Sequence, residues 1–203
     1  MKKLKLLMAV ASVCLATGQA FADGHKKTMW DVIVNDQRFS TFAVMVENAG
    51  VQNLFDERNR INATVYVPTN FAFTTMPESA IAALRIPVNK GPLTKLIKSH
   101  YFVGTQPNLK PGDYFMTKNI NGDQVKIAQE RDLFVKDMVV QAEPIKAGRS
   151  TIIPVDCVMF VQPSSTDYRL SLEQQEASAI TSCCLRSMKE VAAFISTPEF
   201  IEP

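Results

Sequence analysis

The sequence predicts an α+β domain followed by a C-terminal helical extension. Apolar residues recur at helical spacing over Met29–Ala49, whereas β-rich and alternating runs dominate from Tyr114 to Val161. Between two of these runs lies Asn121-Gly122, a pair that strongly favours a tight hairpin. Helices first and strands second are typical of the α+β class. We therefore place one domain at residues 23–163 and a linker with an amphipathic helix at residues 164–203.

Residues 1–22 have the organisation of a cleavable secretory signal peptide. Three lysines precede an uncharged apolar run, and Ala20-Phe21-Ala22 has the small-x-small pattern that signal peptidases cleave. The run at residues 6–17 is shorter than the roughly 20 apolar residues that span a bilayer. We expect export to a periplasmic, secreted or cell-surface location, with no transmembrane segment after cleavage. The short basic start is typical of a bacterial signal.

Cleavage at this point also sets the charge of the mature chain. The full sequence carries a formal net charge of +2, and removing Lys2, Lys3 and Lys5 lowers it to −1. A chain this close to neutrality has no electrostatic basis for binding nucleic acid or an anionic membrane surface.

Helices are expected first within the domain. The spacing over Met29–Ala49 fits two helical pieces joined near Asn35-Asp36, with Ser40 capping the second and Gly50 ending it. A later helix follows Pro92, which suits a first helical turn. The apolar face of that helix carries Leu93, Leu96, Ile97 and His100.

One strand is expected among these helices and several after them. The β-rich run Ala63–Val67 ends at Pro68, and Thr69 or Asn70 is expected to cap the helical turn that follows. A short helix is then expected at Ser79–Leu84. The later strands are predicted at Tyr114–Thr117, Gln124–Ala128, Leu133–Val135, Met138–Ala142 and Thr151–Val161.

Four segments, in this order, resemble the hallmark segments of fasciclin domains. They are the opening helices at 30–33 and 36–42, the first box at Thr64–Phe73, the central segment at Leu96–Gly104 and the closing box at Ile152–Val161. The resemblance covers roughly residues 28–162. It implies a fold in which N-terminal helices pack on a β-wedge, and it implies an extracellular adhesion or recognition module.

The same resemblance implies candidate contact residues, namely His100, Tyr101 and Asp156. The central segment of the family usually has Tyr-His, but here Ser99 precedes His100. With that tyrosine missing, a hydrogen-bonded core histidine is favoured over a residue that contacts a ligand or adhesion partner. The closing box departs too, because Arg149-Ser150 and Ile153 replace the usual Asn-Gly and His.

No pattern of catalytic residues is found. The sequence lacks Gly-x-Ser-x-Gly, His-Glu-x-x-His and a glycine-rich phosphate loop, and only His25 and His100 are present. We therefore expect no enzyme. The resemblance to fasciclin domains implies instead an exported, non-catalytic module that binds a protein, glycan or matrix partner.

An alternative function is periplasmic metal or small-ligand binding. Cleavage after Ala22 would leave the mature terminus Asp23-Gly24-His25. Its α-amine, two amide nitrogens and imidazole can form the square-planar site that Cu(II) and Ni(II) prefer. We expect no other cofactor. A cut one residue away would abolish this site.

Three cysteines remain after cleavage, at Cys157, Cys183 and Cys184. In an oxidising compartment, Cys157 can pair with either of the other two, which leaves one thiol over. The tail carries an apolar stripe at Leu185, Met188, Ala192 and Ile195. The stripe either docks on the domain or binds a partner, and the stripe or the spare thiol offers a route to a homodimer.

Overall fold

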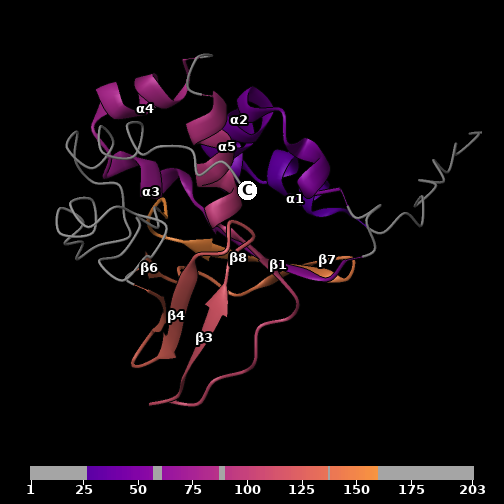
Figure 1. Ribbon diagram of the computed structural model, residues 1–203, viewed down its shortest axis with the longest axis vertical. Helices are drawn as coiled ribbons and strands as arrows, with labels where there is room; N and C mark the ends of the chain where they lie inside the picture. The colour runs from indigo at the N-terminus through magenta and orange to yellow at the C-terminus, as the bar shows by residue number, and fades with distance from the viewer. Residues whose placement is uncertain (1–26, 57–60, 87–89, 137, 160–203) are drawn as a thin grey trace, which may run out of the picture.

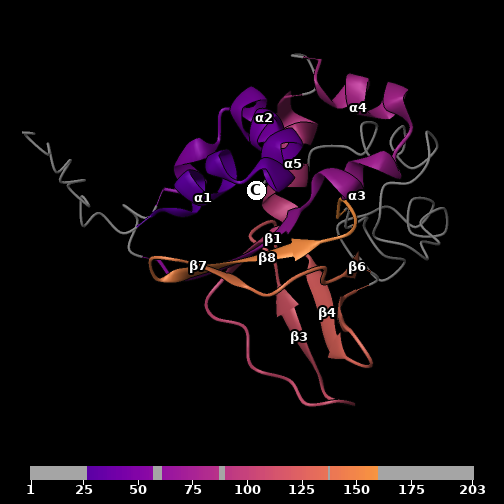
Figure 2. The ribbon, with the colours of Figure 1, turned by 180° about the vertical axis from the view of Figure 1, so that it is seen from behind.

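The computed structural model describes residues 27–56, 61–86, 90–136 and 138–159. In this part of the chain, a layer of helices covers one face of a sheet, and a second sheet lies on the other side of that sheet (Figures 1 and 2). The arrangement confirms the predicted α+β class, with helices packed on a wedge of two sheets. The predicted signal peptide and the C-terminal extension lie outside the described residues.

The helices are short and end where the sequence provides local stop signals. A capping box starts α1, because Thr28 accepts a hydrogen bond from the Asp31 N–H while Asp31 accepts one from the Thr28 N–H. Gly50, at φ 70°, ends α2 in the left-handed conformation that favours glycine. The helices are α1 Met29–Asn35, α2 Ser40–Ala49, α3 Asn70–Thr74, α4 Glu78–Leu84 and α5 Lys90–Ser99, with 3-10 turns η1 Gln37–Phe39 and η2 Gln52–Leu54.

Sheet A has the strand order β2-β1-β8-β7 and brings together segments that are distant in the sequence. Its strands are β1 Ala63–Pro68, β2 Tyr101–Val103, β7 Ile145–Ala147 and β8 Ser150–Val155. The central strands β1 and β8 pair in parallel, with Thr64 opposite Thr151 and Tyr66 opposite Ile153. All six residues of each central strand are buried, as expected for parallel strands covered on both faces.

Sheet B has the order β3-β4-β5-β6 and is antiparallel throughout. Its strands are β3 Tyr114–Lys118, β4 Gln124–Gln129, β5 Leu133–Val135 and β6 Met138–Val139. The turn between β3 and β4 contains Gly122 at φ 88°, so the hairpin predicted at Asn121-Gly122 is confirmed.

Two apolar clusters cover the two faces of sheet A. Val65, Val67 and Ile152 pack with the helices, whereas Tyr66 and Ile153 pack with residues of sheet B. This alternation follows from the side-chain period of two along each strand. Sheet A is therefore the middle layer of the domain.

Several sequence predictions need correction. The strand predicted at Ala63–Val67 among the helices is confirmed as β1, which pairs with β8, but other details differ. Ser40 is the first residue of α2 and not its cap, and the Thr69 side chain makes no capping bond to α3. The predicted strand Thr151–Val161 ends at Val155, where the chain bends at Asp156. Within the described part of the chain, no helix combines the length and the hydropathy needed to cross a membrane.

Candidate functional site

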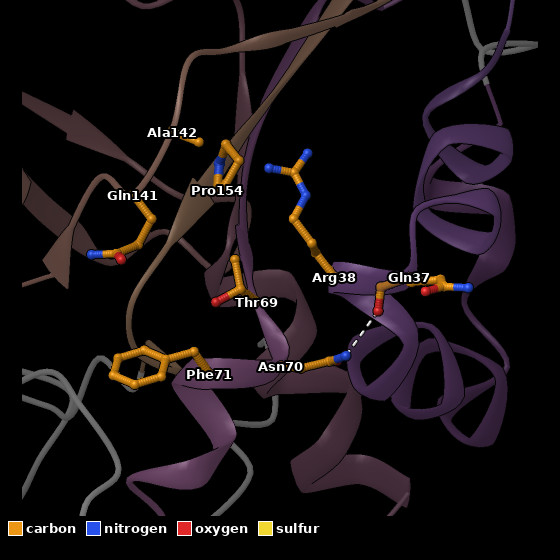
Figure 3. A pocket seen from close by; sticks show the side chains of 8 residues that line it. All are labelled: Gln37, Arg38, Thr69, Asn70, Phe71, Gln141, Ala142 and Pro154. Carbon is orange, nitrogen blue, oxygen red and sulfur yellow. Dashed lines mark hydrogen bonds between the residues drawn. The ribbon is translucent and has the colours of Figure 1, made fainter.

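An open groove lies where β1 and β8 end, beside the turn that precedes α2 (Figure 3). Because β1 and β8 are parallel, their carboxyl ends meet at the same edge of sheet A, where ligands of open sheets commonly bind. The groove has a volume of about 460 Å³. It is lined by Gln37, Arg38, Thr69, Asn70, Phe71, Gln141, Ala142 and Pro154.

Phe71 provides the aromatic surface of the groove. It lies in the first turn of α3, and 62% of its side chain is exposed. Phe73, two residues later, is 3% exposed and packs in the core. The helix therefore buries one aromatic ring and leaves the other available for contact.

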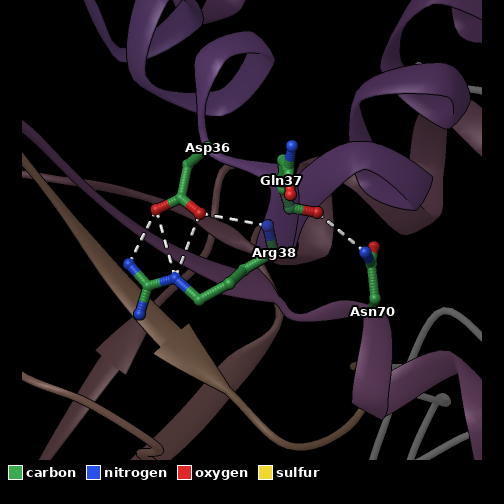
Figure 4. Close-up of polar contacts among 4 residues, drawn as sticks. All are labelled: Asp36, Gln37, Arg38 and Asn70. Atoms are coloured by element: carbon green, nitrogen blue, oxygen red, sulfur yellow. Dashed lines mark hydrogen bonds and ion pairs between the residues drawn. The ribbon is translucent and has the colours of Figure 1, made fainter.

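Asn70 fixes the beginning of α3 against the beginning of α2. Its Nδ2 donates to the Gln37 carbonyl at 2.8 Å (Figure 4). Its Oδ1 accepts a hydrogen bond from the Thr41 N–H at 3.0 Å. Since Phe39 offers no side-chain cap to α2, Asn70 serves as that cap from another part of the chain. The amide is fully engaged and positions its neighbour Phe71.

Arg38 enters the groove as an oriented cation. Its Nη2 donates to Asp36 Oδ2 at 2.7 Å and its Nε to Asp36 Oδ1 at 3.1 Å, which gives a forked ion pair (Figure 4). The hydrogen bond from Arg38 lowers the pKa of the Asp36 carboxyl and raises the pKa of the guanidinium. Both side chains keep solvent access, at 49% for Arg38 and 25% for Asp36.

The side chains that line this groove are of the kinds that bind a partner surface. It presents an aromatic ring, a guanidinium, amides and a hydroxyl, and these groups recognise a surface by packing and hydrogen bonding. Among the described residues, no three His, Cys, Asp or Glu side chains gather in a way that could hold a metal ion.

His100 lies in the core and away from the groove. Its side chain is 0% exposed and bridges two segments of the chain. Nδ1 donates to the Tyr66 carbonyl at 2.7 Å, and Nε2 accepts from the Met159 N–H at 2.9 Å. These partners fix a neutral tautomer with the proton on Nδ1. Burial lowers the pKa of His100 to about 4, despite the opposing bond to Tyr66.

The two other predicted contact residues also have structural surroundings. Tyr101 is 8% exposed and packs edge-on against Phe55, with ring centroids 6.1 Å apart. Asp156 is partly buried, and its Oδ1 accepts from the Val139 N–H at 2.8 Å while its own N–H donates to the Val139 carbonyl. The buried rings of His100 and Tyr101 are therefore not available for direct contact, and Asp156 anchors β6.

Other predicted sites fall partly or wholly outside the described residues. Cys157 takes part in a disulfide, but its predicted partners Cys183 and Cys184 lie outside this range, so the pairing stays a prediction. The terminus Asp23-Gly24-His25 lies outside it as well, and the copper or nickel site also stays a prediction.

Sequence reasoning missed Arg38 and Phe71 as site residues. It had no means of telling the exposed Phe71 from the buried Phe73 by residue type alone. A helical projection offers the signal that was not used, since residues two positions apart point about 200° apart around a helix. The two rings of this short helix therefore cannot both face the same core.

Comparison with known proteins identifies the domain family of the chain. The family model described as "Fasciclin domain" matches residues 37–161. A protein of the cyanobacterium Synechocystis sp. (strain PCC 6803), named sll1483, is 27% identical over 130 residues, which are 64% of this chain and 64% of that protein. The chain thus spans less than two thirds of this relative.

One solved structure with a similar fold is a FAS1 domain pair from the insect cell adhesion molecule fasciclin I. It superposes with a TM-score of 0.54 at 13% identity and covers 64% of this chain. This chain in turn covers 49% of the insect chain, so the similarity concerns a single domain of the pair and shows the fold.

Replacing Asn70 with alanine should loosen the joint between α2 and α3. We expect Asn70→Ala to lower the free energy of unfolding by about 2 kcal/mol, since it removes a helix cap and leaves the Gln37 carbonyl without this donor. Urea denaturation measures the difference. The exposed Asn48, on α2, offers the control Asn48→Ala, which should change stability by less than about 0.5 kcal/mol. Equal losses in the two variants would contradict the capping role.

His100 should make the folded state sensitive to mild acid. Its pKa of about 4 in the folded state lies below the value of about 6.5 expected in the unfolded chain. The unfolded state therefore gains the proton first, and stability falls as the pH drops from about 6.5 to about 4, by up to about 3 kcal/mol. We expect His100→Gln, although less stable at pH 7, to lose much of this slope in urea titrations across that range. Parallel pH profiles for both proteins would refute the assignment.

Proposed function

From the premise that this chain belongs to the fasciclin domain family, we propose that it is an exported, non-catalytic recognition module that engages its partner through the groove beside α3. Domains of this family are typically extracellular, adhesion-related and non-enzymatic. The signal-peptide pattern of residues 1–22 supports export to the periplasm or the cell surface. The groove supplies the contact surface that the buried His100 and Tyr101 cannot supply.

The observation that carries this proposal is that the exposed ring of Phe71 and the oriented guanidinium of Arg38 line the same groove. Aromatic and arginine side chains supply a large share of the binding energy at protein interfaces. Pro154 and Ala142 add apolar surface, and Gln37 and Gln141 also line the groove. This composition favours a protein partner, and a glycan or matrix partner is the competing outcome.

The groove is also prepared for binding in the free protein. Asn70 holds the start of α3, and Asp36 holds Arg38, so the helix that carries Phe71 and the guanidinium of Arg38 are ordered before the partner binds. Groups ordered in advance reduce the entropic cost of association.

Truncating Phe71 should weaken partner binding while the fold survives. In a pull-down from intact cells with immobilised residues 23–203, we expect Phe71→Ala to capture at least about tenfold less partner than the unchanged chain. Removing an aromatic anchor costs about 2 kcal/mol or more of binding free energy. The captured partner is then titrated directly by calorimetry. Tyr114→Ala is the matched control, since Tyr114 is 64% exposed on β3 and does not line the groove.

The two variants and two enzyme treatments separate the outcomes. If Phe71→Ala and Tyr114→Ala bind equally well, the groove is not the interface. Loss of capture after protease treatment of the cells would support a protein partner. Loss after glycosidase treatment alone would favour a glycan.

A further inference from the structure

A second cavity lies on the other face of sheet A, between this sheet and sheet B. The parallel register places Thr64, Tyr66, Thr151 and Ile153 on one face of β1 and β8. The segment after β2 and two side chains of sheet B, Ile127 and Leu133, contribute to the walls. The volume is about 370 Å³, within the range of small-molecule sites. The remaining lining residues are Thr105, Gln106, Pro107, Asn108, Pro144 and Lys146.

Tyr66 lines this cavity and carries an unsatisfied polar group. Its side chain is 0% exposed, and its hydroxyl has no hydrogen-bond partner among the described residues. The ring is fixed edge-on against Phe102, with centroids 5.3 Å apart. Buried hydroxyl groups nearly always have a partner in folded proteins, so an unpaired one beside a cavity points to a molecule that completes it.

Lys146 supplies the only charge among the described residues that line the cavity. Its Nζ donates to Thr151 Oγ1 at 2.8 Å, which holds the ammonium group beside the wall of the cavity. The Lys146 side chain is exposed, whereas Tyr66 is buried, so the charge lies toward solvent. A ligand therefore meets a cation at the outer end and a neutral hydroxyl in the interior.

The positions of these two residues in sheet A give the distance between their Cα atoms. Strand β8 lies between the strands that carry Lys146 and Tyr66. Lys146 is opposite Thr151 and Tyr66 is opposite Ile153, so Lys146 and Tyr66 are also offset by two positions along β8. With strands about 4.8 Å apart and a rise of about 3.3 Å per residue, their Cα atoms lie about 12 Å apart. The apolar side chains of Ile127, Leu133 and Ile153 also line the cavity.

We propose that this cavity binds a small carboxylic acid with an apolar body and a hydrogen-bonding group at its other end. The carboxylate pairs with the Lys146 ammonium, and the far group bonds to the Tyr66 hydroxyl. The apolar body packs against the isoleucine and leucine side chains between them. This site is separate from the groove beside α3 and does not depend on it.

Two linear probes test the proposal by calorimetry on residues 23–203. We expect 8-hydroxyoctanoate to bind about tenfold more tightly than octanoate, because one additional hydrogen bond is worth about that factor. Tyr66→Phe keeps the ring and should abolish this preference. Lys146→Gln should weaken both probes by about tenfold, while the control Lys118→Gln, at an exposed lysine of β3, should change neither.

A stability measurement distinguishes ligand binding from a structural role of the hydroxyl. Since this group makes no hydrogen bond in the free protein, Tyr66→Phe should leave the free energy of unfolding unchanged or raise it. Phe71→Ala should leave the affinity for 8-hydroxyoctanoate unchanged, so failure at the groove and failure at this cavity are distinguishable. The proposal is overturned if neither probe binds at millimolar concentration, if Tyr66→Phe retains the preference, or if Lys118→Gln weakens binding as much as Lys146→Gln.

Discussion

Parallel pairing of β1 with β8 holds together the two halves of this domain. The Ala63 N–H donates to Ser150 Oγ across 87 positions of sequence, and the paired strands form the centre of sheet A. The imidazole of His100 reinforces this centre, since it links the Tyr66 carbonyl of β1 to the Met159 N–H beyond β8. Closing so long a loop costs entropy before any contact forms. Burial on both faces of the sheet and a fully bonded histidine offset that cost.

The two faces of the central pair explain why the domain has two separate cavities. On one face, Val65 and Val67 pack with helices, and the chain leaves β1 through Thr69 to form the groove with α3. On the other face, Tyr66 reaches toward sheet B, and packing there leaves space between the layers. The groove is open, and both an arginine and an aromatic ring line it. The cavity is mostly apolar inside, with its single charge toward solvent.

Features encoded over a few neighbouring residues were predictable from the sequence, whereas features that depend on distant partners were not. The strand Ala63–Val67, the end of α2 at Gly50 and the Asn121-Gly122 hairpin follow from local pattern and turn chemistry. The role of Asn70 was missed because the N–H that it caps lies 29 positions away, while local reasoning looks only at the following turn. The position of β1 within sheet A was missed for the same reason. Burial of His100 was the favoured interpretation, and the structure agrees with it.

Neighbouring residues Asn70 and Phe71 show how stability and recognition are divided at the groove. The amide of Asn70 is saturated by hydrogen bonds to the start of α2 and has little left to offer a partner. The adjacent ring of Phe71 remains 62% exposed, although burying such a ring would contribute roughly 1.5–3 kcal/mol to folding. Because Asn70 anchors the helix that carries Phe71, the backbone from which the ring projects is held in place. An exposed ring on a helix that is held in place by a fully hydrogen-bonded side chain is the arrangement expected of a rigid recognition surface.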